Sequence, residues 1–164
     1  MILAILAGIY IFFKPLEIKQ QKFVDVPLFE LQNFTLYELD TKGLHTIMLG
    51  SAAIRYSDRY RVENMDYTDS SKGYIANMCA DKSIYKDDFV TLSGHVKYTR
   101  DDGLSFQTQK ATYDKNSSIV ESKVGYEAYF NESTIKGSYI RYNNAKNRIF
   151  SKNVQAKIQL QESK

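Results

Sequence analysis

Residues 106–113 read FQTQKATY, and three other stretches of the chain repeat their plan. Each stretch ends in a tyrosine, and the four tyrosines recur at intervals of about 29 residues. A large apolar residue stands seven positions before each tyrosine, and a small residue stands five before it. The tyrosines are Tyr56, Tyr85, Tyr113 and Tyr142; the large residues are Leu49, Met78, Phe106 and Ile135; the small ones are Ser51, Ala80, Thr108 and Gly137.

Turn signals divide each repeat into two strands. Short polar clusters of Asp, Asn, Ser, Lys and Gly follow the tyrosines, and a second set of such clusters lies between the repeats. The eight predicted turns fall at residues 40–43, 57–59, 69–73, 86–88, 101–103, 114–118, 131–133 and 143–147. Eight turns separate nine strand segments, which indicates an antiparallel meander.

The hydrophobic pattern of these segments has a period of two. Val90, Leu92, Val96 and Tyr98 share one parity, which predicts one apolar and one polar face. The same parity runs through Val120, Val124 and Tyr126, and through Phe150, Val154, Ala156 and Ile158. No helical pattern competes outside the amino terminus. We therefore predict an all-β fold, an antiparallel jelly roll or β-sandwich of strand-turn-strand repeats, with an N-terminal membrane-anchor helix.

The anchor is predicted from residues 1–13, MILAILAGIYIFF, which carry no charged side chain. A helix of this length spans about 20 Å, so residues up to 18 are added to approach a hydrocarbon core of about 30 Å. A cleavable signal peptide is the alternative, although no basic segment precedes the apolar run. The lysines follow the run, so charge alone leaves the orientation open. The predicted organisation is anchor 1–18, linker 19–32, β domain 33–160 and tail 161–164.

Composition limits the remaining functional classes. The chain has 164 residues, 43% of them hydrophobic, and a net charge of +3, which suits one domain with a core and does not suggest a nucleic-acid binder. Cys79 is the only cysteine, so an internal disulfide is impossible. A Cys79–His95 thiolate pair is conceivable, but a packed cysteine and solvent-facing histidines at 45 and 95 are the better interpretations. We predict a protein that is not an enzyme and that has no cofactor or metal.

One modification is a hypothesis of lower weight. Residues 114–118 fit an acceptor site for bacterial N-glycosylation at Asn116, but turn chemistry alone also places Asn and Ser there.

Three stretches of the chain resemble the LptC family of lipopolysaccharide export proteins. They are LSGHV at 92–96, GLSFQTQKATYDKNSSIVESKV at 103–124 and IKGSYIRYNNAKNRIFSKNVQAKI at 135–158. The resemblance covers about residues 30–160 and implies a single-pass inner-membrane anchor followed by a periplasmic jelly roll. Gly43 and Gly137 match glycines of that family. Gly43 suits a turn with positive φ, whereas a side chain at position 137 would be expected to clash with an adjacent strand.

The resemblance and the parity pattern together predict the site and the partners. Acyl chains of lipopolysaccharide would lie on the apolar face, an inner-membrane ABC transporter would supply the lipid, and an LptA-like periplasmic bridge protein would receive it. The predicted lipid-binding residues are Val90, Leu92, Val96, Tyr98, Val124, Tyr126, Val154 and Ile158. The predicted partner edge consists of Asn153, Val154, Gln155, Ala156, Lys157 and Ile158.

Two other functions remain open on sequence alone. A membrane-anchored structural or adhesive β domain would share the repeat and bind no lipid. An enzyme acting on envelope glycans would need an acid pair on the apolar face, and the parities predict none.

Overall fold

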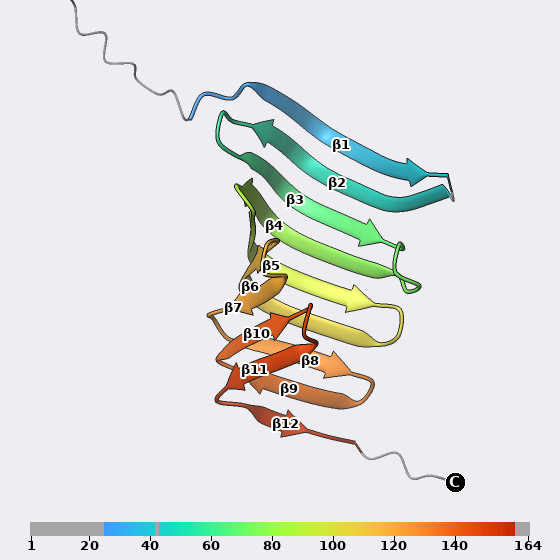
Figure 1. Ribbon diagram of the computed structural model, residues 1–164, viewed down its shortest axis with the longest axis vertical. Helices are drawn as coiled ribbons and strands as arrows, with labels where there is room; N and C mark the ends of the chain where they lie inside the picture. Colours follow the sequence, from blue (N-terminus) through green and yellow to red (C-terminus); the bar gives the residue numbers. More distant parts are fainter. Residues whose placement is uncertain (1–24, 42, 160–164) are drawn as a thin grey trace, which may run out of the picture.

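The computed structural model describes residues 25–41 and 43–159, which form one antiparallel sheet (Figure 1). Its strands are β1 (Phe29–Asp40), β2 (Gly43–Arg55), β3 (Tyr60–Asp69), β4 (Ala76–Lys86), β5 (Phe89–Arg100), β6 (Leu104–Asp114), β7 (Ile119–Ser122), β8 (Tyr126–Phe130), β9 (Ser133–Gly137), β10 (Tyr139–Asn143), β11 (Arg148–Lys152) and β12 (Gln155–Lys157). The prediction of an all-β antiparallel fold is confirmed for these residues. The expected anchor, 1–18, lies outside the described residues, and within the described ranges no helix could cross a membrane. Strand β1 begins before residue 33, where the domain was expected to begin.

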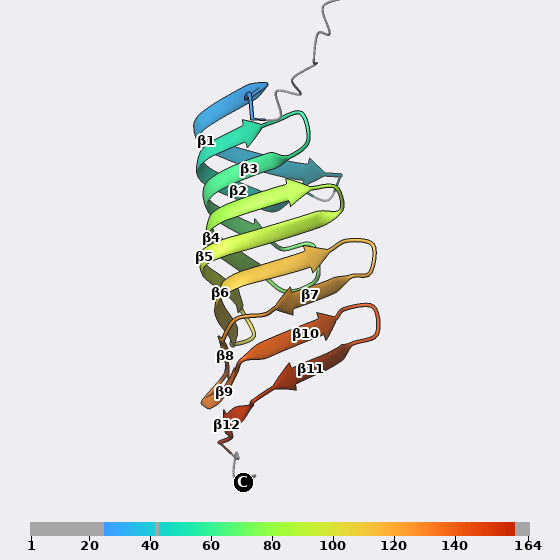
Figure 2. The ribbon, with the colours of Figure 1, turned by 90° about the vertical axis from the view of Figure 1, so that its left-hand side faces the viewer.

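The eight predicted turns all connect strands, and they lie at two opposite rims of the sheet (Figure 2). The first rim holds the β1–β2, β3–β4, β5–β6 and β8–β9 turns. The second rim holds the β2–β3, β4–β5, β6–β7 and β10–β11 turns. The nine predicted strand segments become twelve strands because the last three segments are each interrupted midway, as β7/β8, β9/β10 and β11/β12.

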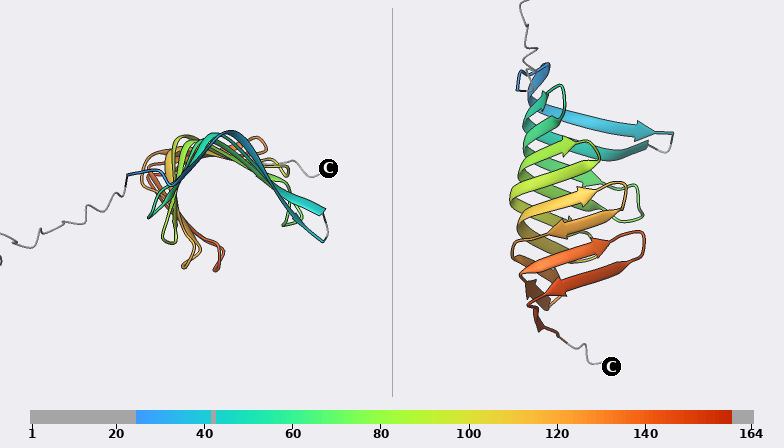
Figure 3. Two further views of the ribbon diagram at one scale, coloured as in Figure 1. Left: turned by 90° about the horizontal axis from the view of Figure 1, so that it is seen from above. Right: turned by 60° about the vertical axis from the view of Figure 1, so that its left-hand side comes forward.

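A bend crosses the middle of every long strand, and we call this line the crease. Asn33, Asn64 and Asn153 lie on it with φ of 50, 49 and 53°, values that asparagine tolerates better than most residues. Gly94 and His95 on β5 also have positive φ, and the register of β5 against β6 shifts between Ser93 and Val96. Such a bulge bends a strand sharply. The sheet is therefore folded into an open arch with a first and a second wall, each named after its rim (Figure 3).

Strand β6 divides the sheet at the crease. Its first half pairs with β8 on the first wall, and its second half pairs with β7 on the second wall. Beyond β6 the walls continue as separate ribbons, β8-β9-β12 and β7-β10-β11. Hydrogen bonds of the buried Thr108 side chain stabilise the point where β6 divides the sheet. The Thr108 hydroxyl lies 3.0 Å from that of Ser122 and donates to the Gly125 carbonyl at 3.0 Å.

The core lies on the concave face, between the walls. Met65, Ala80, Leu92, Val96 and Ala111 are buried there in one cluster. The predicted two-sheet sandwich is thus a single sheet folded on itself, because every long strand contributes to both walls. Side chains that face each other across the crease do the packing that two separate sheets would do in a sandwich.

The crease also changes which residues face inward. Leu49 pairs with Asp66 on the convex face, and its neighbour Met48 pairs with Tyr67 on the concave face, so the first repeat is displaced by one residue. Phe150 pairs with Arg141 on the convex face, although its parity matches Ala156, which pairs with Ile135 on the concave face. The positive φ of Asn153, between Phe150 and Ala156, changes the face to which the following side chains point. The predicted common face of Phe150 and Ala156 is therefore wrong.

Large and small residues face each other on the concave side of the crease. Three cross-strand pairs show this alternation: Phe34 with Gly50, Met65 with Ala80, and Tyr126 with Gly137. The small residues of the repeat make room for the large side chains of the neighbouring strand at the point where the walls come together.

Candidate functional site

An apolar row crosses the concave side of the first wall. Directly paired residues of an antiparallel sheet point to the same face, so the pairings define the row. It runs from β1 to β12 through Leu36, Met48, Tyr67, Met78, Tyr98, Phe106, Ala128, Ile135 and Ala156. The row contains no charged side chain along its whole length.

The second wall carries a matching row that is rich in tyrosine. It consists of Tyr60, Tyr85, Val90, Tyr113, Val120, Tyr142 and Ile149, in the order of the paired strands. Val90 packs against the core cluster, which places this row on the concave face. Three of the four repeat tyrosines therefore line the second wall, and the fourth, Tyr56, is buried where β2 ends.

The middle of the concave face is closed by packing and its two ends are open. Leu92 and Val96 are 6% and 3% exposed, whereas Leu36 at one end is 52% exposed and Ile149 at the other is 69% exposed. Exposed apolar side chains of this size at both ends of the sheet leave apolar surface there that further apolar groups can cover.

Five of the eight predicted lipid-binding residues lie together on this face. Val90, Leu92 and Val96 belong to the core or pack against it. Tyr98 lies in the first-wall row, opposite Met78. Tyr126 is buried and stacks on Phe106 with ring centroids 5.6 Å apart.

The other three predicted residues lie outside the strands. Val124 is 38% exposed in the connection between β7 and β8, and Val154 and Ile158 flank β12 at the end of the sheet. Sequence reasoning also left out several residues that the face does contain, notably Met48, Met65, Tyr67, Met78 and Phe106. Met78 and Phe106 could have been found from the repeat, since both stand at its large apolar position.

A small cavity opens on the first wall near its rim. It has a volume of about 130 Å³ and is lined in part by Tyr67, Met78 and Tyr98. Burial raises the pKa of the Tyr98 phenol to about 12, and the neighbouring Tyr74 adds to the shift. The phenol therefore stays neutral at any physiological pH, and the charges that line the cavity come from Asp69 and Lys72.

The residues considered for catalysis are dispersed or occupied. The Cys79 thiol donates to Asn77 Oδ1 at 3.2 Å, and burial, with the nearby Asp66 carboxylate, raises its pKa. His95 Nδ1 lies 2.8 Å from Asp81 Oδ2 on the exposed side of the crease. His45 Nδ1 contacts the Thr46 hydroxyl. A thiol held neutral beside an amide is a poor nucleophile.

A larger hollow, of about 530 Å³, lies where β6 divides. His95, Lys97, Gln107, Gln109 and Glu127 contribute to its lining, and these polar residues lie on the opposite face from Val96 and Tyr126. Val96 and Tyr126 of the concave face line it as well, so the hollow is not confined to one face of the sheet.

The predicted partner edge lies at the carboxy-terminal end of the sheet. Strand β12 pairs with β9 on one side, and its other side has no partner among the described residues. Gln155, Ala156 and Lys157 are all exposed. Asn153, at the crease, donates from Nδ2 to the Ser138 hydroxyl and fixes the direction in which the chain enters β12.

The two predicted glycines have different physical roles. Gly43 adopts a φ of 120° in the β1–β2 turn, and a Cβ there would contact nothing within 4 Å. Gly137 has no positive φ, but a Cβ would lie 2.6 Å from Tyr126 Cε1, 3.0 Å from Ser151 Oγ and 3.1 Å from the Lys152 carbonyl. The expected turn at Gly43 and the expected clash at Gly137 are both confirmed.

Comparisons with known proteins agree with this architecture. A sequence model of the family described as "Lipopolysaccharide-assembly, LptC-related" matches residues 1–159. The fold is similar to the crystal structure of LptH, the LptA-homologous periplasmic component of the lipopolysaccharide transport device of Pseudomonas aeruginosa, with a TM-score of 0.53 at 12% identity. The similarity covers 85% of this chain and 99% of that one. No curated protein matches the sequence at a significant level.

Proposed function

Because the chain belongs to the LptC-related family of lipopolysaccharide-assembly proteins, we propose that its concave face carries the acyl chains of lipopolysaccharide. The lipid would come from an ATP-driven transporter of the inner membrane and pass to a periplasmic bridge protein. The observation that supports this most is the uncharged apolar row that crosses the sheet from β1 to β12 and is exposed at its ends.

Burial of acyl chains on this face supplies the driving force. Each buried methylene contributes about 0.8 kcal/mol, so a chain of about twelve carbons gains roughly 10 kcal/mol. Successive strands offer similar apolar positions in the two rows, so a lipid can move from strand to strand between sites of similar depth. No chemical step is required of the protein, and the transporter's ATPase supplies the energy.

The edges of the sheet set the direction of transfer in this proposal. Strand β1 presents a free edge toward the transporter. At the opposite end the two ribbons end in β11 and β12, and the bridge protein would add its own strand to β12. Strand addition would place the two concave faces end to end. Residues 1–18 would anchor the chain in the inner membrane, with the β domain in the periplasm.

Proline in β12 should weaken the association with the bridge protein. Successive backbone N–H groups of a strand point to opposite sides, one toward β9 and the next toward the free side of β12. One of the two variants Ala156→Pro and Lys157→Pro therefore removes a hydrogen-bond donor from the free side, and the other removes a donor that faces β9. The variant with the smaller change in melting temperature identifies the free side. We expect that variant to retain less than about a tenth of the bridge protein retained by wild type in a pull-down, consistent with loss of about 1.4 kcal/mol. Full retention by both variants would contradict the docking edge.

The transport proposal is tested in cells in which the chromosomal copy is depleted. Wild-type chain should restore lipopolysaccharide to the outer membrane, measured by surface labelling. A variant that is folded, membrane-bound and unable to bind lipid should not restore it. Restoration by such a variant would favour the second candidate, a membrane-anchored interaction domain with no lipid ligand, which the exposed edge of β12 would also suit.

A further inference from the structure

Two cations and two tyrosines form a single stack at the second rim. The Arg55 guanidinium lies 5.2 Å from the Tyr60 ring centroid, and the Tyr60 and Tyr85 rings stack with centroids 6.1 Å apart. The Lys115 ammonium covers Tyr85 at 4.3 Å. Tyr60 and Tyr85 are neighbours in the second-wall row, and Arg55 pairs with Tyr60 at the start of that row. The stack therefore lies along the concave face, next to Val90. We call these four residues the cation stack.

The charges of the cation stack are not neutralised. Within residues 25–41 and 43–159, neither Arg55 nor Lys115 forms an ion pair. Both ammonium and guanidinium retain unused N–H donors and are held over aromatic rings, which fixes their positions without consuming their charge.

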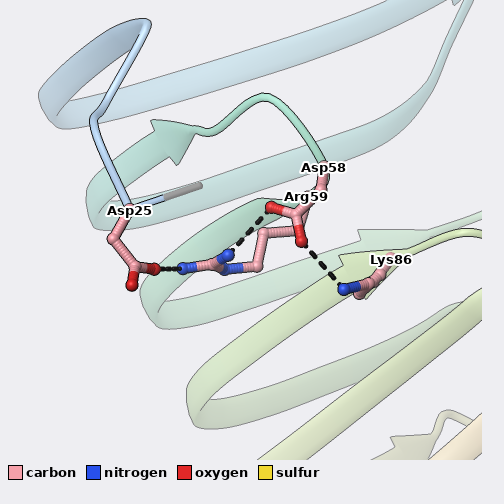
Figure 4. A network of polar contacts seen from close by, with 4 residues as sticks. All are labelled: Asp25, Asp58, Arg59 and Lys86. Carbon is pink, nitrogen blue, oxygen red and sulfur yellow. Dashed lines mark hydrogen bonds and ion pairs between the residues drawn. The ribbon is translucent and has the colours of Figure 1, made fainter. Parts of the chain in front are cut away.

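Neighbouring cations of the same rim are paired instead (Figure 4). Arg59 binds Asp25 and Asp58, and Lys86 Nζ lies 2.8 Å from Asp58 Oδ2. The hydrogen bond from Lys86 lowers the pKa of the Asp58 carboxyl, so this pair is charged at neutral pH. Lys146 and Arg148, at the β10–β11 turn of this rim, are also without an ion pair among the described residues, but Arg55 and Lys115 are the unpaired cations that lie over the tyrosine rings of the concave face.

The opposite rim has the other sign. Arg100 lies over the Tyr74 ring at 4.2 Å, in an arrangement like that of the cation stack, but it is paired with Asp102. Carboxylates dominate the described part of that rim; they include Glu38, Asp40, Asp69, Asp101 and Asp102. The turns of the second rim also carry four carboxylates, but its cations outnumber them; the carboxylates are Asp58, Asp87, Asp88 and Asp114, and the cations are Arg55, Arg59, Lys86, Lys115, Lys146 and Arg148. An anionic group is therefore attracted more to the second rim than to the first.

We propose that the cation stack binds a phosphoryl group on the headgroup of the lipid whose acyl chains lie on the concave face. The inference rests on the proposed function and adds the orientation of the lipid: the phosphate side of the headgroup lies at the second rim. Arg55 offers a planar fork of donors and Lys115 a compact charge, the two cationic forms that bind phosphate best. Val90 and the tyrosine rings begin the apolar surface directly beside them.

The test uses full-length chain in detergent with a photo-reactive benzoylphenylalanine at position 98 on the first wall. The probes are lipid A with both phosphates and the same lipid A after enzymatic removal of its phosphates. Adduct yield is measured against lipid concentration for wild type, for Arg55→Gln/Lys115→Gln, and for Lys146→Gln/Arg148→Gln. The last pair removes the same charge from the same rim, and Arg148 lies on the convex face.

Wild type should bind phosphorylated lipid A about tenfold more tightly than the dephosphorylated form. Arg55→Gln/Lys115→Gln should remove that difference and leave binding of the dephosphorylated lipid unchanged, whereas Lys146→Gln/Arg148→Gln should keep it. In the wild-type chain, the tenfold preference for phosphorylated lipid A should also narrow at about 0.5 M salt, because salt screens the attraction between the cation stack and the phosphate. A structural effect of the substitutions would not make wild-type binding depend on salt in this way. Equal binding of the two lipids by wild type would overturn the cation stack alone and leave lipid carriage intact. Adducts with neither lipid would overturn both.

Discussion

Val90→Glu should reduce the lipopolysaccharide carried by the chain at least tenfold while the β domain remains folded. Val90 is a partly buried member of the second-wall row, one residue from the β4–β5 turn. A carboxylate at this position can reach water past the rim, so folding is tolerated. An acyl chain laid along the row would have to desolvate that carboxylate, which costs more than the contact returns. Lipopolysaccharide that copurifies with full-length chain measures the effect.

Thr91→Glu is the matched control, because Thr91 is the next residue and its partners Ile84 and Thr112 lie on the convex face. The control should carry lipid at the wild-type level. If both variants carried lipid normally, the concave face would not be the binding surface. If both lost it equally, the effect would come from added charge rather than from its position.

Gly137→Ala should cause a large loss of stability in the β domain. The new Cβ would meet the Tyr126 ring at 2.6 Å and the Lys152 carbonyl at 3.1 Å. Tyr126 cannot easily move, because its hydroxyl lies 2.8 Å from Ser151 Oγ and its ring stacks on Phe106. Overpacking of a fixed site costs about 1–3 kcal/mol, a large part of the stability of a domain this size.

Gly125→Ala is the control for that substitution. Gly125 lies on the same crease, and its Cβ would come no closer than 3.8 Å to the Gly137 carbonyl. We expect the melting temperature of the full-length chain in detergent to fall by several degrees for Gly137→Ala and to stay nearly constant for Gly125→Ala. Equal melting temperatures for the two variants would show that the crease has room at Gly137.

The turns and strand pairing were predictable because their signals are local. Asp, Asn, Gly and Ser at the eight turns, and alternation in segments such as 90–98, depend on a few consecutive residues. The crease was not predictable in the same way. Asn33, Asn64 and Asn153 look like solvent-facing strand residues, and only the folded sheet shows that their positive φ bends the chain.

The site was predicted well on β5 and poorly beyond β7, and the form of the crease explains both outcomes. On β5 the bulge at Gly94 and His95 spans two residues, so Leu92 and Val96 keep a common parity across the crease. In the last three segments the strand is interrupted at the crease, so the period of two does not continue across it. The residue that this period assigned to the apolar face, Val124, therefore lies in the connection between β7 and β8. The cation stack depends on Lys115 reaching Tyr85 from a turn about thirty residues away, a contact that no local pattern encodes.

Photo-crosslinking in living cells tests the central claim most directly. Benzoylphenylalanine at position 98 would point to the concave face, and the same group at position 97 would lie on the convex face, because Lys97 pairs with Cys79 and Gln107. The proposed function predicts a lipopolysaccharide adduct from position 98 and none from position 97. Adducts from 97 alone, or from neither position in a folded, membrane-bound chain, would contradict a lipid path along the concave face.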